Sequence, residues 1–150
     1  MKIKIVEITE MSQRVLDAFD SLVPQLSSTS PKPSWEEMEE IIKSKCSILL
    51  AAVDENDENG KIFGSMTLVV FRTPTGIRSW IEDVVVDQSA RGQGIGEALV
   101  KAAVERAKKE NAKSIDLTSR PSREAANRLY RRCGFVQRDT NIYRMGLDHD

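Results

Sequence analysis

The spacing of apolar residues changes several times along the chain, and each change predicts a new element. In residues 2–8 apolar and charged residues alternate, which predicts a half-buried strand. After Thr9, the expected helix cap, apolar residues recur at helical spacing as far as Leu26 and predict one buried helix face. Residues 27–34 hold two prolines among serines and are expected to form a loop.

A second helix and a hairpin follow this loop. Ser34 and Glu37 form a capping-box pattern ahead of a helix at residues 35–43. The two N-terminal helices with their loop fit either a lid or an ordinary surface connection.

Residues 46–53 and 62–71 are predicted to be antiparallel strands joined by the charged turn 54–61, which ends in Asn-Gly. The acidic residues of this turn lack the spacing of a calcium-binding EF-hand loop, so a solvated hairpin tip is expected.

The second half of the chain alternates predicted strands and helices. Strands are expected at residues 78–86, 114–118, 135–137 and 142–147. Helices are expected at residues 97–110 and between Ser122, its cap, and Gly134. The predicted fold class is therefore α+β: a mixed, mostly antiparallel sheet flanked by helices on both faces, forming a single domain over residues 1–150.

Composition excludes several classes of function. The 22 basic and 23 acidic residues nearly cancel, and no apolar run approaches the roughly 20 residues of a membrane span, so we expect a cytoplasmic protein with no nucleic-acid or membrane partner. His149, the only histidine, is one residue from the C-terminus, where it is poorly placed for a catalytic triad or a metal. Cys46 and Cys133 lack zinc or disulfide spacing and are expected to be buried thiols, so no metal cofactor is predicted.

Three glycines at alternate positions, Gly92, Gly94 and Gly96, lie between a predicted strand and a predicted helix. Without side chains there, main-chain N–H groups can converge on an anion at the helix N-terminus, which indicates a phosphate-binding loop. A P-loop is excluded because Glu97 and Ala98 follow where Lys and Ser or Thr are required. A dinucleotide-binding fold is disfavoured because the spacing is G-x-G-x-G and the strands before it are hairpin-linked.

Residues 91–96, R-G-Q-G-I-G, match every fixed position of the pyrophosphate-loop motif Q/R-x-x-G-x-G/A of the GNAT superfamily of acyl-CoA N-acyltransferases. Residues 125–135, A-A-N-R-L-Y-R-R-C-G-F, resemble the second signature of that family. The resemblance covers residues 81–135 and implies an acetyl-CoA-dependent N-acetyltransferase that acts by direct attack of an amine on the thioester.

The resemblance also implies the residues that bind acetyl-CoA. They comprise the pyrophosphate loop, a strand whose backbone pairs with the pantetheine arm, and one helix residue: Arg91, Gly92, Gln93, Gly94, Ile95, Gly96, Val84, Val85, Val86 and Asn127. In this role the helix N-terminus and the charge of Arg91 would attract the pyrophosphate.

Two side chains are candidates for proton transfer. Tyr130 matches the tyrosine of the family and is suited to protonate the departing thiolate, because a phenol stays protonated at neutral pH. Glu82 is the favoured base for the amine, acting directly or through water. Glu82 and Asp83 are adjacent, so a regular strand would point them to opposite faces, although a bulge would weaken this argument.

The acceptor stays open at this stage. The stretch W-I-E-D-V-V-V resembles glucosamine-phosphate N-acetyltransferases, and Arg120 could bind an anionic acceptor, but Trp80 replaces the expected histidine. A small-molecule amine such as an amino sugar, amino acid or polyamine is favoured, with residues 27–34, Trp35 and 138–143 shaping the choice. The alternatives are a protein or peptide acetyltransferase and a non-catalytic acyl-CoA-binding regulatory domain, and a homodimer is also left open.

Overall fold

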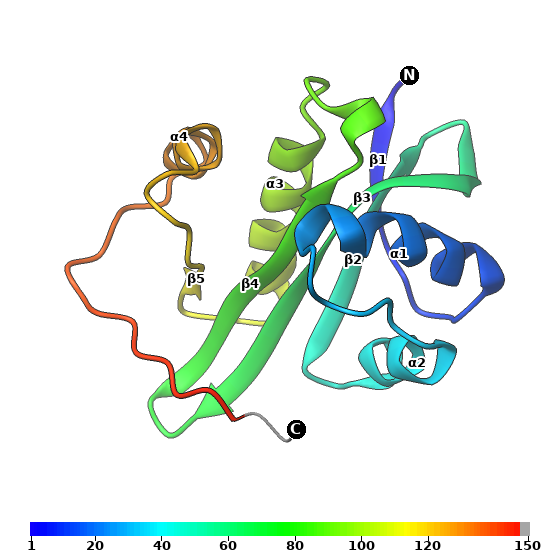
Figure 1. Cartoon of the computed structure of the whole chain (residues 1–150). Helices are drawn as coiled ribbons and strands as arrows, with labels where there is room; N and C mark the ends of the chain where they lie inside the picture. The colour runs from blue at the N-terminus through cyan, green and yellow to red at the C-terminus, as the bar shows by residue number, and fades with distance from the viewer. Residues whose placement is uncertain (148–150) are drawn as a thin grey trace.

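A computed structural model describes residues 1–147. Its elements, in order, are β1 (Ile3–Glu7), α1 (Gln13–Leu26), α2 (Trp35–Lys43), β2 (Ser47–Asp54), β3 (Asp57–Thr73), β4 (Gly76–Val86), η1 (Gln88–Ala90), α3 (Ile95–Lys109), β5 (Ile115–Asp116) and α4 (Glu124–Arg132). The five strands form one sheet in the order β1-β2-β3-β4-β5, antiparallel except for the β4–β5 pair. This arrangement confirms the predicted fold class (Figure 1).

Helices cover both faces of the sheet, and β2 is buried on both sides between its first and last residues. Leu49, Ala51 and Val53 pack beneath α1 and α2, whereas Ile48, Leu50 and Ala52 pack on the other side, beneath α3. The two halves of the core therefore share one strand, as expected when both faces of a strand are buried. The glycine-rich loop lies at the upper end of β4 in Figure 1, and the β3–β4 turn lies at the lower end.

A β-bulge interrupts β4 next to the candidate site. Pairing with β3 passes from Thr67–Glu82 to Ser65–Val85, so Asp83 and Val84 together oppose one residue. Asp83 adopts a left-handed backbone with φ of 54°. The bulge reverses the side-chain alternation: Ile81 belongs to the core under α3, whereas Val85, four positions later, belongs to the core under α1.

The outer edge of β4 is only briefly paired. Two residue pairs, Ser79–Ile115 and Trp80–Asp116, join it to β5. Within residues 1–147, positions 81–86 of β4 have no strand partner on this side. Between the bulge and the glycine-rich loop, the backbone N–H and C=O groups on this edge therefore form no hydrogen bonds to another strand of the described residues.

Several predicted boundaries were wrong for local reasons. α1 begins at Gln13 and is capped by Ser12, whose Oγ accepts a hydrogen bond from Val15 N at 3.3 Å, rather than by Thr9. Arg123, not Ser122, occupies the N-cap of α4 and provides no side-chain cap. The capping box of α2, in contrast, is present as predicted.

The β2–β3 hairpin also turns earlier than predicted. Asp54 pairs with Asp57, and Asn56 N donates a hydrogen bond to Asp54 Oδ1 at 2.9 Å, so the aspartate side chain closes the turn. Asn59 and Gly60, the expected turn pair, instead lie inside the longer strand β3.

The expected closing hairpin was also wrong: residues 135–147 contain no strand. From α4 this C-terminal segment descends on the outer side of β5 to the lower end of the view, where the β3–β4 turn also lies (orange to red in Figure 1). Its large apolar side chains are exposed: Val136, Ile142, Tyr143, Met145 and Leu147. A strand requires a partner for its backbone, and β5, which spans two residues rather than the predicted five, offers little edge.

The two cysteines differ in burial. Cys46 is exposed and Cys133 half-buried, so the prediction of two buried thiols was wrong for Cys46. No helix within residues 1–147 has the length and apolar character needed to cross a membrane.

Candidate active site

The glycine-rich loop enters α3 through two left-handed residues. Gly92 and Gly94 have φ of 79° and 77°, and a Cβ added to either would meet nothing within 4 Å. Here glycine is needed for backbone conformation, and the space in front of the loop is open. Gly96 differs, since its Cβ would lie 3.5 Å from Leu129 Cδ2 on α4, an ordinary van der Waals contact, so neither space nor backbone conformation requires glycine there.

The first turn of α3 has free donors. Gly94 is the N-cap and provides no side-chain hydrogen bond, and the first helical bond is Ala98 N to Gly94 O, at 3.0 Å. The N–H groups between them have no intrahelical partner and carry the positive end of the helix dipole. The side chain of Ile95 is buried, so this residue anchors the helix in the core and can offer a ligand only its backbone.

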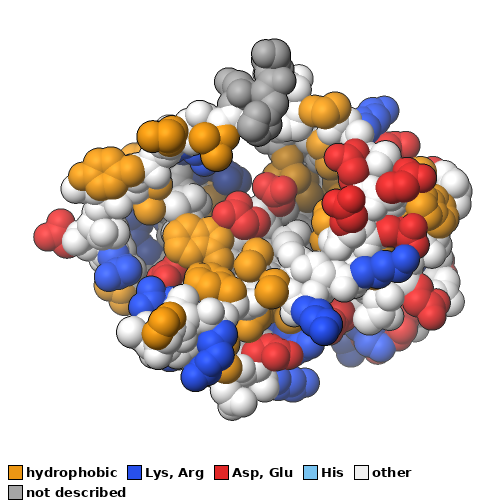
Figure 2. All heavy atoms as spheres, turned by 90° about the horizontal axis from the view of Figure 1, so that it is seen from below, with side chains coloured by type: hydrophobic (Ala, Val, Ile, Leu, Met, Phe, Trp, Pro, Cys, Tyr) orange, Lys and Arg blue, Asp and Glu red, His pale blue; other side chains and the backbone are white. Residues whose placement is uncertain are grey.

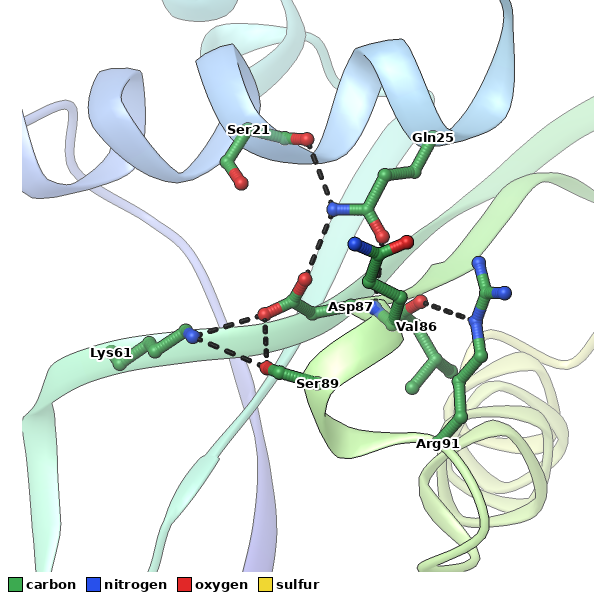
Figure 3. A network of polar contacts seen from close by, with 8 residues as sticks. Ser21, Gln25, Lys61, Val86, Asp87, Ser89 and Arg91 are labelled. Atoms are coloured by element: carbon green, nitrogen blue, oxygen red, sulfur yellow. Dashed lines mark hydrogen bonds and ion pairs between the residues drawn. The ribbon is translucent and has the colours of Figure 1, made fainter.

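The side chains of Arg91 and Gln93 in this loop are exposed. Arg91 is folded back on the strand that precedes it, where its Nε donates a hydrogen bond to Val86 O at 3.3 Å (Figure 3). This contact leaves the terminal guanidinium nitrogens available and holds the positive charge at the junction of strand and loop.

The three valines of β4 divide between the two faces of the sheet. Val84 and Val86 are half-buried and pack on the α3 side, whereas Val85 is buried on the α1 side. Their side chains serve the core, so contact with a ligand would involve the backbone edge that has no strand partner, where Val86 O already accepts the hydrogen bond from Arg91.

Tyr130 lies on α4 and is 7% exposed. Its ring meets Phe135 edge to face, with ring centroids 6.0 Å apart. Burial raises the pKa of the Tyr130 phenol above its ordinary value, and the nearby positive charge of Arg123 only partly opposes this shift. The hydroxyl therefore stays protonated at neutral pH and can act as a hydrogen-bond or proton donor.

Asn127 lies one turn earlier on α4 and holds the chain that leads into the helix. Its Nδ2 donates a hydrogen bond to Arg120 O at 3.0 Å, which leaves the amide oxygen free for another partner. Beside Arg120, Ser119 Oγ is fully buried and has no hydrogen-bond partner among residues 1–147. The sequence did not single out this serine, and no motif marks it.

The two candidate bases, Glu82 and Asp83, are both exposed and flank the start of the bulge. Strand alternation therefore no longer decides between them, because Asp83 occupies the irregular position. The end of the molecule opposite the glycine-rich loop is hollowed, with apolar, acidic and basic side chains around the hollow (Figure 2). Within residues 1–147 no cluster of three or more potential metal ligands occurs, and His149 lies outside the described residues.

Comparison with known proteins identifies the family. Residues 14–135 match the model of the acetyltransferase (GNAT) family. Glucosamine 6-phosphate N-acetyltransferase 1 from Oryza sativa subsp. japonica is 27% identical over 146 residues, which cover 94% of this chain and 84% of that protein.

Two solved structures share the fold. An aminoglycoside acetyltransferase from an uncultured soil metagenomic sample, in complex with trehalose, superposes with a TM-score of 0.83 at 18% identity, covering 97% of each chain. AAC(6')-Iy in complex with the bisubstrate analogue CoA-S-monomethyl-acetylneamine gives 0.79 at 15% identity, covering 99% of this chain and 100% of that one. The glycine-rich loop, the order of elements and the match over residues 14–135 agree, and the chain belongs to the GNAT family of acetyltransferases.

Proposed function

We propose that the protein transfers the acetyl group of acetyl-CoA to a primary amine of a small molecule. The observation that carries the proposal is the loop at residues 91–96, where two left-handed glycines open onto free N–H groups of α3. These donors and the helix dipole suit the CoA pyrophosphate, with Arg91 adding a full positive charge. The proposed cofactor set is the one predicted above, in which Gln93, Ile95 and Gly96 contribute backbone.

The unpaired edge of β4 supports a position for the rest of the donor. In this proposal the amides of the pantetheine arm pair with the backbone at Val84, Val85 and Val86, as an added strand would. The free amide oxygen of Asn127 would accept a hydrogen bond from the same arm. The thioester would then lie near the bulge, between the exposed carboxylates of β4 and Tyr130 on α4.

The proposed reaction is a single direct attack. The amine nitrogen bonds to the thioester carbonyl carbon, and the carbon–sulfur bond breaks. Glu82 takes the amine proton, directly or through water, and the Tyr130 phenol donates a proton to the departing sulfur. Because its pKa is raised, Tyr130 is protonated before the sulfur leaves.

The favoured acceptor is an amino sugar, with an amino acid or polyamine as the other small-molecule choices. The similarity to a rice enzyme named for glucosamine 6-phosphate supports this choice, as does Arg120, an exposed cation beside the α4 entry. The acidic side chains around the hollow in Figure 2 suit an ammonium group. A peptide N-terminus or lysine is the alternative acceptor, and a regulatory domain that binds acyl-CoA without turnover is the alternative function.

The experiment measures thiol release from acetyl-CoA with glucosamine 6-phosphate, an aminoglycoside, a polyamine and a lysine peptide. Tyr130→Phe and Glu82→Gln should each lower kcat by roughly 100-fold, the usual scale of general acid–base catalysis, with CoA affinity unchanged. Asp83→Asn decides between the two candidate bases: with Glu82 as the base, this variant should stay within about threefold of wild type. Wild-type turnover in both Tyr130→Phe and Glu82→Gln would contradict the mechanism.

We also propose a homodimer, because the C-terminal segment exposes five large apolar side chains: Val136, Ile142, Tyr143, Met145 and Leu147. Light scattering should give about twice the chain mass of 16.8 kDa. The variant with Tyr143→Ser and Met145→Ser should give the mass of one chain. A wild-type protein with the mass of one chain would contradict the dimer and leave the reaction unaffected.

A further inference from the structure

Asp87, immediately after β4, is the one charged residue that is buried among residues 1–147. Its carboxylate accepts hydrogen bonds from side chains of three different elements (Figure 3). Ser89 Oγ of η1 lies 2.7 Å from Oδ2, Lys61 Nζ of β3 lies 3.0 Å from Oδ2, and Gln25 Nε2 of α1 lies 3.0 Å from Oδ1. One carboxylate thus joins two secondary-structure elements to the segment that enters the glycine-rich loop.

The Gln25 side chain extends this connection to the loop backbone. Its Nε2 donates both to Asp87 Oδ1 and to Ser21 O, at 3.0 and 3.1 Å, and its Oε1 accepts from Gln88 N at 2.9 Å. Both hydrogens of the amide group are used, and the amide oxygen faces a donor. Rotating the amide by 180° would place its oxygen against two other acceptors, Asp87 Oδ1 and Ser21 O. Asp87 therefore fixes the orientation in which Gln25 accepts the hydrogen bond from Gln88 N.

Backbone bonds hold the same short segment from the other side. Asp87 N donates to Phe63 O, and Ala90 N donates to Asp87 O, both at 2.8 Å. Ala90 is itself buried. Residues 87–90 are therefore held through side chains and backbone, and the open glycine-rich residues begin at the next position.

A buried carboxylate is costly unless it is hydrogen-bonded, which makes its presence here informative. The hydrogen bonds from Ser89, Lys61 and Gln25 hold the pKa of Asp87 well below its usual range, so the group is ionised. A negative charge beside a pyrophosphate loop cannot serve as a ligand for the pyrophosphate. Its three donors all come from the protein, so its function must be exerted on the protein.

We propose that Asp87 is a positioning residue for the acyl donor: together with Gln25 it fixes the loop entrance and couples the end of α1 to CoA binding. The inference rests on the proposed function, because it takes the glycine-rich loop as the CoA site. Residues 27–34, which were predicted to shape the acceptor site, begin two positions after Gln25. The contact therefore also connects the donor loop with the chain segment expected on the acceptor side.

The test compares CoA affinity, measured by calorimetry, in Gln25→Ala and Asp87→Asn, with steady-state kinetics in acetyl-CoA. Both variants should weaken CoA binding by roughly 10-fold, on the scale of one buried hydrogen bond to a charged group, and raise KM for acetyl-CoA with kcat within about twofold. The double variant should be little worse than either single one, because the two residues act as a unit. Gln13→Ala is the matched control, since Gln13 bonds Asp17 on the exposed side of α1, at 2.8 Å, and should bind CoA as wild type does.

A merely structural role would lower the melting temperature and leave CoA affinity unchanged, which would overturn the inference. If Asp87→Asn fails to fold, Gln25→Ala decides alone, because it removes the link to Gln88 and leaves the Lys61 and Ser89 contacts in place. Failure of wild-type protein to bind CoA would refute the proposed function. Tight binding by wild type and both variants would refute only the positioning role.

Discussion

The glycine-rich loop and the C-terminal segment illustrate two different relations between sequence and structure. Residues 87–90 are held by contacts with α1 and β3, and the left-handed conformations that follow occur at Gly92 and Gly94. Residues 136–147 also contain apolar positions that predict strands, yet their large apolar side chains lie exposed. The difference shows that a glycine acts through its own φ, whereas a strand depends on a partner that the local sequence does not specify.

The largest effect is expected from Gly94→Glu. This change puts a negative charge in the loop and a side chain at φ of 77°, so CoA affinity should fall by at least roughly 100-fold. The fold should persist, because the added Cβ would meet nothing within 4 Å. Calorimetry with CoA and a thermal melt measure the two effects.

Gly146→Glu is the matched control in the C-terminal segment, where an added Cβ also meets nothing within 4 Å. It should bind CoA as wild type does. Unaltered affinity in Gly94→Glu would remove the loop from the donor site.

A second comparison concerns stability. Leu99 on α3 is fully buried, so Leu99→Ala should lower the free energy of unfolding by about 2–5 kcal/mol. Leu147 is 73% exposed, and Leu147→Ala should change the stability of a single chain by less than about 0.5 kcal/mol. Urea unfolding of dilute protein measures both, and a large loss in Leu147→Ala would show that the segment packs on its own chain.

The smallest effect is a pH dependence that arises at Asp87. Its pKa is lowered in the folded state, so the stability it contributes is present above the unfolded-state pKa of about 3.9 and is lost as the pH falls further. The difference in melting temperature between wild type and Asp87→Asn should therefore be constant from pH 7 to about 5 and shrink below about 4. A difference that stayed constant down to pH 3 would show that Asp87 is not ionised in its native setting.

The sequence predicted the features that depend on local residues and missed those that depend on a distant partner. The capping box of α2, the strand β2 and the glycine-rich loop before α3 were predicted because each depends on residues a few positions apart. The β4 bulge could not be placed, since Asp83 is left-handed only through its register against β3. The link between Gln25 and Asp87 joins residues 62 positions apart, a separation that no local sequence pattern spans.

The candidate site, too, was predictable only where it depends on local sequence motifs. Motif and resemblance led to the loop and to Tyr130, whose burial and raised pKa suit a proton donor. Regular alternation predicted that only one of Glu82 and Asp83 faces the acceptor site, and the bulge removes that argument. Ser119 was missed because a buried, unpaired hydroxyl is visible only in three dimensions.

The most direct test of the central claim is the rate of free thiol formation when wild-type protein, acetyl-CoA and glucosamine 6-phosphate are mixed, compared with Gly94→Glu at equal concentration. If the glycine-rich loop is the donor site, wild type should release thiol in an amine-dependent way, and Gly94→Glu should release it only at the background rate. Equal rates in the two proteins would contradict the claim that this loop holds the acyl donor.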